Sequence, residues 1–110
     1  MYINWTMRIV GAASILALAV LCAPVKSQDK SAATYKQKCV TCHGADGKGD
    51  TPAGKSMKVR SFSDPETKKM SDDELAAIIE KGKNKMPAYG KGMSAEDIKG
   101  MVAYIRSLAK

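Results

Sequence analysis

The chain has few of the side chains from which enzymes build active sites. Its 110 residues include one histidine, three cysteines, one phenylalanine, one tryptophan and four tyrosines. We find no nucleophile beside a base and no pair of acids in a plausible cleft, so the sequence offers no catalytic constellation. No segment alternates apolar and polar residues as a strand does, and no internal repeat divides the chain. These absences favour one small all-α domain.

The longest apolar run is too short for an ordinary membrane span. Ile9–Leu21 has 13 residues, whereas a helix needs about 20 to cross a bilayer. Arg8 precedes the run and a short polar segment follows it, which is the order of a secretory signal peptide. We therefore predict a signal peptide over residues 1–27 and a mature domain over residues 28–110, exported to the periplasm. An uncleaved leader would instead anchor the domain at the membrane.

Cys22, at the end of the apolar run, is open to two interpretations. The residues before it faintly resemble a lipoprotein signal, in which the cysteine would be lipidated. Leu21 argues against this, because small residues are preferred directly before a lipidated cysteine. The alternative is that Cys22 is discarded with the leader.

Acidic residues are outnumbered by basic ones. The whole chain carries a net charge of +7. The leader removes Arg8 and Lys26 from the 18 basic residues, so the mature part has 16 basic against 11 acidic residues, or +5. The lysines are scattered and aromatics are few, which argues against nucleic-acid binding. The excess predicts a surface that attracts acidic partners, or one that only keeps a small protein soluble.

The single histidine follows the only two cysteines outside the leader, in Cys39-Val40-Thr41-Cys42-His43. Cys-x-x-Cys-His is the attachment pattern of a c-type haem. Two thiols add across the two porphyrin vinyl groups, and the imidazole reaches the iron. A zinc site would need a fourth ligand, and a redox dithiol would not need the histidine. We predict one covalent haem c with its iron, attached through Cys39 and Cys42, with His43 as proximal ligand.

The small core is a second reason to expect a prosthetic group. Beyond the leader only Phe62 and three tyrosines remain as aromatic residues. A domain of 83 residues rarely builds a sufficient core from its polypeptide alone. A buried porphyrin would supply the missing apolar surface.

The first expected helix runs over residues 32–41, with Ser31 as its N-cap. It delivers the haem motif at its end. The glycine-rich stretch that follows forces a loop. Residues 50–64 are expected to be irregular, and residues 65–69 to add a short helical turn.

Two further helices are expected over residues 72–81 and 95–109. Each shows apolar residues at helical spacing. Each also begins with a serine that has an acidic residue three positions later, as in a capping box. The pairs are Ser71 with Glu74 and Ser94 with Asp97. Gly82 is a natural end for the first of the two helices.

In this order, the features resemble a class I monohaem cytochrome c of the bacterial and mitochondrial type. Tyr35 precedes Cys39 by four residues, residues 85–89 resemble the loop of the sixth iron ligand, and residues 102–108 resemble the C-terminal helix. The resemblance covers about residues 32–110. It implies a small all-α cytochrome c fold, with three main helices wrapped around a covalent haem. The residues at which the first and last helices would cross are Ser31, Tyr35, Gly100 and Tyr104.

Met86 is our prediction for the sixth iron ligand. A thioether is a soft neutral donor that raises the reduction potential of haem, and Pro87 restricts Met86 to extended geometry. Met93, in the same loop, is the alternative. The other methionines beyond the leader are expected elsewhere: Met101 in the core, and Met57 and Met70 in segments without a Met-Pro pair.

Other residues are candidates for contacts around the haem. The resemblance implies that the carbonyl at Pro52 accepts a hydrogen bond from the second ring nitrogen of His43. Tyr89 is expected to pack on the haem edge, to reach a propionate or to be an ordinary loop aromatic. Basic residues that would neutralise propionates, or only serve solubility, are Lys55, Lys58 and Arg60. Those expected to flank the ligand loop and dock partners are Lys81, Lys83, Lys85 and Lys91.

An iron with both axial positions filled has no open site for a substrate. The sequence therefore predicts single-electron transfer between exported or membrane redox partners, and no enzyme activity. The carrier would be a monomer that binds redox proteins with acidic docking surfaces transiently. The alternative is an accessory haem subunit of a membrane oxidase or a dehydrogenase complex. Haem catalysis or gas sensing would need an open sixth position, against which Met86 argues.

Overall fold

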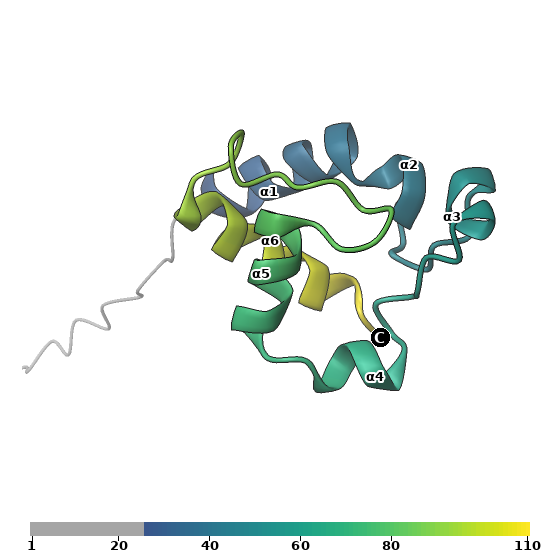
Figure 1. The fold of residues 1–110 in the computed structure, drawn as a ribbon. Helices are drawn as coiled ribbons and strands as arrows, with labels where there is room; N and C mark the ends of the chain where they lie inside the picture. The colour runs from purple at the N-terminus through teal and green to yellow at the C-terminus, as the bar shows by residue number, and fades with distance from the viewer. Residues whose placement is uncertain (1–25) are drawn as a thin grey trace, which may run out of the picture.

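The computed structural model of this chain describes residues 26–110 (Figure 1). The apolar run of the predicted leader and Cys22 lie outside the described residues. Six helices follow one another: α1 Lys26–Lys38, α2 Val40–His43, α3 Pro52–Ser56, α4 Pro65–Lys69, α5 Asp72–Lys81 and α6 Ala95–Leu108. Over this part of the chain there is no strand, only an isolated bridge between Lys83 and Met86. The predicted all-α class, with three main helices α1, α5 and α6, is confirmed.

The start of the first helix was predicted wrongly. α1 begins at Lys26 rather than after Ser31, and Ser31 lies inside the helix with only 6% of its surface exposed. The reason is tertiary: a Cβ atom at Gly100 would lie 2.8 Å from the Ser31 hydroxyl. Ser31 is thus a small residue at a close crossing with α6, and it does not cap α1.

α5 and α6 begin as the sequence predicts. The Ser71 hydroxyl accepts a hydrogen bond from the N–H of Glu74 (3.1 Å), and the Glu74 carboxylate accepts one from the N–H of Ser71 (2.7 Å). Ser94 and Asp97 form the same reciprocal pair at α6. α5 ends at Gly82, whose φ of 75° is costly for residues with a Cβ atom. α6 ends one residue earlier than predicted, at Leu108.

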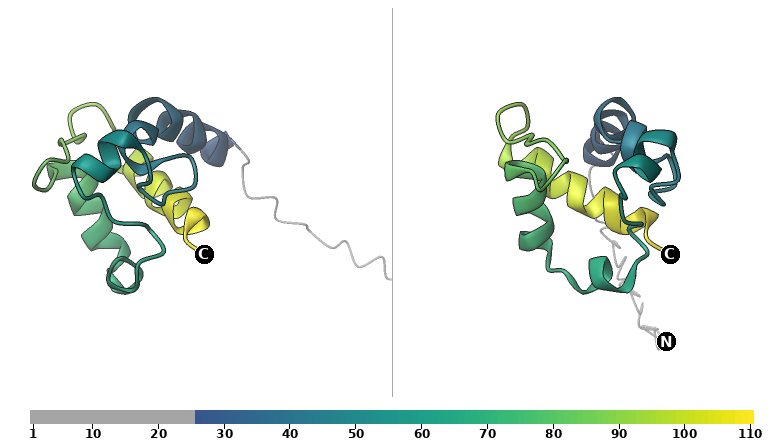
Figure 2. Two further views of the ribbon diagram at one scale, coloured as in Figure 1. Left: turned by 90° about the vertical axis from the view of Figure 1, so that its right-hand side faces the viewer. Right: turned by 45° about the vertical axis from the view of Figure 1, so that its right-hand side comes forward.

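The core lies where α6 packs against both α1 and α5 (Figure 2). Tyr35 of α1 and Met101 of α6 are its most buried side chains, each 1% exposed. The Tyr35 ring lies 5.1 Å from the ring of Tyr104, and the Tyr35 hydroxyl donates to the carbonyl of Gly44 (2.6 Å). The predicted crossing of first and last helices is confirmed.

Part of the segment predicted to be irregular is helical. Thr51 caps α3 by accepting the N–H of Gly54 (2.9 Å), and Pro52 occupies the first turn, where its fixed φ is favourable. The Thr51 hydroxyl also donates to the carbonyl of Thr41 (2.7 Å). This contact ties α3 to α2. The predicted turn over residues 65–69 is confirmed as α4.

The last helix is also fastened to the α4–α5 connection. The Arg106 guanidinium donates to the carbonyl of Met70 and to the carboxylate of Asp72 (3.0 Å). Beyond α6, the N–H of Lys110 donates to the Ser63 hydroxyl (3.0 Å). None of the six described helices combines the length and the apolar character needed to span a membrane.

Candidate haem site

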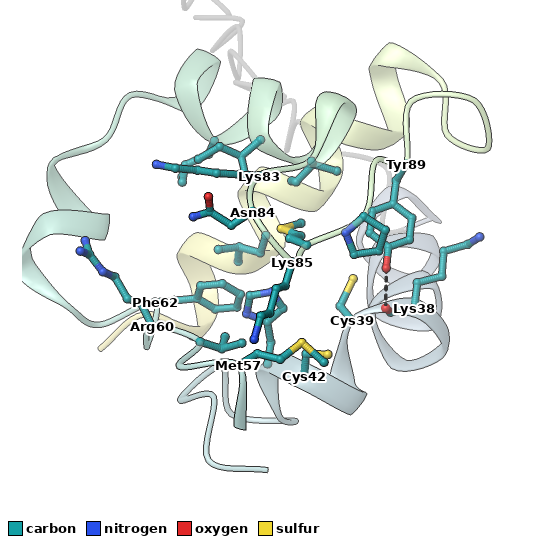
Figure 3. Close-up of a pocket in the computed structure, with 18 of the residues that line it drawn as sticks. Lys38, Cys39, Cys42, Met57, Arg60, Phe62, Lys83, Asn84, Lys85 and Tyr89 are labelled. Atoms are coloured by element: carbon teal, nitrogen blue, oxygen red, sulfur yellow. Dashed lines mark hydrogen bonds between the residues drawn. The ribbon is translucent and has the colours of Figure 1, made fainter. Parts of the chain in front are cut away.

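A cavity of about 960 Å³ opens between α2, α5, α6 and the loop that follows α5 (Figure 3). This volume is at the upper end of the range for small-molecule sites. Apolar side chains form much of its wall; examples are Phe62, Leu75, Ile78, Ile79, Met101 and Ile105. All four residues predicted to hold the haem, Cys39, Cys42, His43 and Met86, line this one cavity.

The haem motif forms a single helical turn. Cys39 is the N-cap of α2, and its carbonyl accepts the N–H of His43 (2.9 Å). Residues three apart on a helix share a face, so both thiols reach the cavity, and both are free and half-buried. Burial raises the pKa of the Cys39 thiol, and the nearby Lys38 ammonium opposes this.

His43 has a buried ring nitrogen with no protein partner. Within residues 26–110 its Nδ1 accepts and donates no hydrogen bond, so the contact predicted with Pro52 is absent. Pro52 begins α3, where its carbonyl points along that helix. The imidazole stacks instead on Phe62, with ring centres 4.8 Å apart. Burial lowers the pKa of His43, which favours the neutral, metal-binding form.

The loop after α5, residues 83–92, is called the ligand loop below. It opens with a tight turn in which Lys83 and Met86 exchange both backbone hydrogen bonds (3.1 and 2.9 Å). Asn84 takes a φ of 53° in this turn. A Cβ atom at Gly82 would lie 2.6 Å from the Met86 carbonyl, so the loop folds directly onto the end of α5. Met86 is half-buried, whereas Met93 is buried in the core, although both line the cavity.

Basic side chains surround the cavity. Those that line it are Lys38, Lys58, Arg60, Lys83 and Lys85, which we call the basic rim; within residues 26–110 no acidic residue lines the cavity. Of the predicted basic residues, Lys81 and Lys91 do not line it. Neither does Lys55, which pairs with Asp50 (3.2 Å).

Three lining residues have contacts that sequence reasoning did not foresee. Phe62 stacks on His43. The only sequence feature that could have pointed to Phe62 is that it is the one phenylalanine of the chain. Lys38 belongs to the basic rim. The only sequence feature that could have indicated this is its position directly before the haem motif. Tyr89 lines the cavity as an aromatic at its edge, but its hydroxyl donates to the carbonyl of Lys38 (3.2 Å).

The residues present fit a haem. Two free thiols and the His43 imidazole lie on one wall of an apolar cavity, and basic groups at its rim can face propionates. A helical fold of this size around such a site defines a small c-type cytochrome.

Comparison with known proteins supports the assignment to the small c-type cytochromes. Residues 26–105 match the family described as cytochrome c oxidase, cbb3-type, subunit III. Cytochrome c-555 of Methylococcus capsulatus is 30% identical over 103 residues, which cover 86% of this chain and 78% of that protein. Cytochrome c6 of Microcystis aeruginosa is 32% identical over 82 residues, 72% of this chain and 94% of that protein.

A solved structure supports the same assignment. The KustC0563 c-type cytochrome superposes with a TM-score of 0.67 at 32% identity, over 73% of this chain and 98% of that one. The chain therefore belongs to the monohaem class I cytochromes c. Its cofactor is a covalently bound haem c with iron, and its role is electron transfer by that haem.

Proposed function

We propose that the protein is a periplasmic single-electron carrier whose haem is attached through Cys39 and Cys42 and ligated axially by His43 and Met86. One observation carries this proposal: these four residues, from α2 and the ligand loop, line a single apolar cavity. The bound haem supplies a one-electron couple of its iron.

Each part of the chain has a task in that chemistry. The thioethers of Cys39 and Cys42 would fix the cofactor to α2. The neutral imidazole of His43 is held by its stacking on Phe62. A thioether from Met86 would favour the reduced iron and raise its potential relative to a second histidine. The apolar wall excludes water, so little around the site needs to reorganise when one electron enters or leaves.

The matching family is described by an oxidase subunit, but the two curated relatives, cytochrome c-555 and cytochrome c6, are small cytochromes, which supports a carrier over a subunit of a larger enzyme. With both axial positions taken, no position remains for a substrate, so we expect no enzyme activity of its own. Copurification of the native protein with a membrane oxidase or dehydrogenase would favour the accessory subunit instead.

Absorption spectra of the protein, expressed with its leader in a host that attaches haem, test the ligand set. We expect a low-spin reduced spectrum that does not change with carbon monoxide. Met86→Ala should lose the thioether-to-iron absorption band and bind carbon monoxide readily, because the sixth position is then open.

Met93→Ala is the matched control, since Met93 lines the same cavity from the core. It should keep the band and the low-spin spectrum. The reverse pattern, with the band lost in Met93→Ala and kept in Met86→Ala, would assign the sixth ligand to Met93. Absence of haem from both variants and the parent protein would overturn the whole proposal.

The leader is part of the proposal. We expect residues 1–27 to be removed on export, leaving a mature chain that begins at Gln28 and acts as a soluble monomer. The intact mass of the purified haem protein tests this directly. A mass that includes residues 1–27 would identify a membrane-anchored form, and an added lipid mass would place lipidation at Cys22.

A further inference from the structure

Tyr89 joins three parts of the structure around the ligand loop. Its N–H donates to the carbonyl of Ile79 in α5 (2.9 Å), and its own carbonyl accepts the N–H of Met93, just before α6 (3.1 Å). Its hydroxyl reaches across to the carbonyl of Lys38 in α1 (3.2 Å; dashed in Figure 3). One residue three positions after Met86 therefore contacts both sides of the cavity.

The hydroxyl contact has no equivalent elsewhere in the loop. Across the described side chains, it is the only hydrogen bond between residues 83–92 and residues 28–43. Lys38 is the last residue of α1 and directly precedes Cys39. Carbonyls at a helix C-terminus lack a donor within the helix, so Tyr89 supplies one at the point where the haem-attachment segment begins.

Apart from the contact with Met93 just before α6, the other hydrogen bonds of the loop in the described chain go to α5 or lie within the loop. Gly82 packs under Met86, the tight turn joins Lys83 to Met86, and the N–H of Gly90 donates to the carbonyl of Glu80 (3.0 Å). Without the Tyr89 hydroxyl, backbone hydrogen bonds would still hold the loop to α5. Within the described residues, no hydrogen bond would then join the loop to α1.

We propose that Tyr89 is a positioning residue whose hydroxyl ties the ligand loop to the haem-attachment segment and so keeps Met86 over the cavity. This inference rests on the proposed ligation by Met86. Release of the tie lets the loop move away from α1, so the sixth position opens more often, while the contacts with α5 remain in place.

The expected size of the effect follows from the environment of the contact. The Tyr89 side chain is half-buried and its hydrogen bond lies at the surface. Removal of one neutral hydrogen bond of this kind should shift the opening equilibrium about threefold to tenfold.

The test uses the full haem protein with Tyr89→Phe, which removes only the hydroxyl. Carbon monoxide binds the reduced iron only when the sixth ligand leaves, so its binding rate reports loop opening. We expect that rate to rise about threefold to tenfold, with the thioether absorption band of the oxidised protein retained. Tyr89→Leu, a second variant without the hydroxyl, should bind carbon monoxide at least as fast.

Two controls separate the tie from other effects. Lys36→Ala changes an exposed side chain of α1 that does not line the cavity and leaves the Lys38 carbonyl in place, so the carbon monoxide rate should not change. Tyr104→Phe removes the same atom from a ring that packs on Tyr35 at the helix crossing, and should also leave the rate unchanged.

Hydrogen exchange distinguishes a tie from general support of the loop. The amides of Tyr89 and Gly90 donate to α5, and their protection should persist in Tyr89→Phe. An unchanged carbon monoxide rate, or loss of protection at both amides, overturns the proposal. A parent protein that lacks the thioether band would instead overturn the ligation by Met86, so the two failures are distinguishable.

Discussion

Gly54 shows how a residue without chemistry of its own can shape the site. A Cβ atom there would lie 2.4 Å from the carbonyl oxygen of Cys42 and 2.3 Å from that of Gly49. α3 therefore lies directly against the backbone of the haem motif, at a distance that only glycine permits. Together with the Thr51 hydroxyl, this contact holds the turn that carries Cys42 and His43.

Gly54→Ala should destabilise the protein by about 1–3 kcal/mol, because backbone atoms and not flexible side chains occupy the space of the new methyl group. Urea unfolding of the haem protein measures the change. The matched control is Gly92→Ala, where the new Cβ would meet nothing closer than the Lys38 ammonium at 4.0 Å. Equal stability of Gly54→Ala and the parent protein would show that α3 can move away from α2 at little cost.

The site residues that could be predicted from the sequence are those that lie next to one another in the chain. Cys39, Cys42 and His43 are adjacent, so their spacing alone indicates their use. Phe62 could not be assigned in the same way, because it reaches the imidazole only after α3 and its flanking loops have folded. The predicted contact between His43 and Pro52 failed because Pro52 begins a helix that was not foreseen.

Among the helices, those with complete local signals were predicted best. α5 and α6 each begin with a serine that caps the first turn and an acid that caps in return. The prediction of where α1 begins failed because Ser31 looks like an N-cap in its local sequence. In the fold it instead lies inside the helix against Gly100, which is far along the chain. α3 had a local signal in Thr51-Pro52, but its five residues give too little periodicity to detect.

The caps also allow a test at the level of the helix. Ser71→Ala should lower the free energy of unfolding by about 1 kcal/mol, because it leaves the N–H of Glu74 without its partner. Ser107→Ala, at an exposed position within α6, removes a hydroxyl that does not cap a helix start and donates only to the carbonyl of Tyr104 in the same helix, and should change stability by less than about 0.5 kcal/mol. Thermal unfolding of the two variants measures the difference. Equal losses would mean that the cap does not stabilise α5.

At the level of the whole molecule, the charged residues that line the cavity are all of one sign. The five residues of the basic rim surround the cavity, and the acids of residues 26–110 lie elsewhere. We propose that this rim docks acidic redox partners, with Lys38, Lys58 and Arg60 in place of the predicted Lys81 and Lys91. Exposed charges of this kind act mainly on the rate of association and lose their effect as salt screens them.

Lys85→Glu should weaken docking at low ionic strength. The probe is a carboxylate-terminated electrode, on which electron transfer from adsorbed protein is recorded. We expect several-fold less electroactive adsorption, with the difference vanishing at high salt. Lys99→Glu changes the net charge equally at an exposed position of α6 outside the rim, and should have a smaller effect. Equal effects of both variants would mean that only net charge matters.

The gathering of positive charge around one opening has a consequence before any contact forms. A molecule whose charges are separated in this way has an electric dipole moment, and the field of an acidic surface exerts a torque on it. As the protein diffuses toward such a surface, it turns until the rim faces forward. A larger share of collisions then begins in an orientation from which an electron can pass.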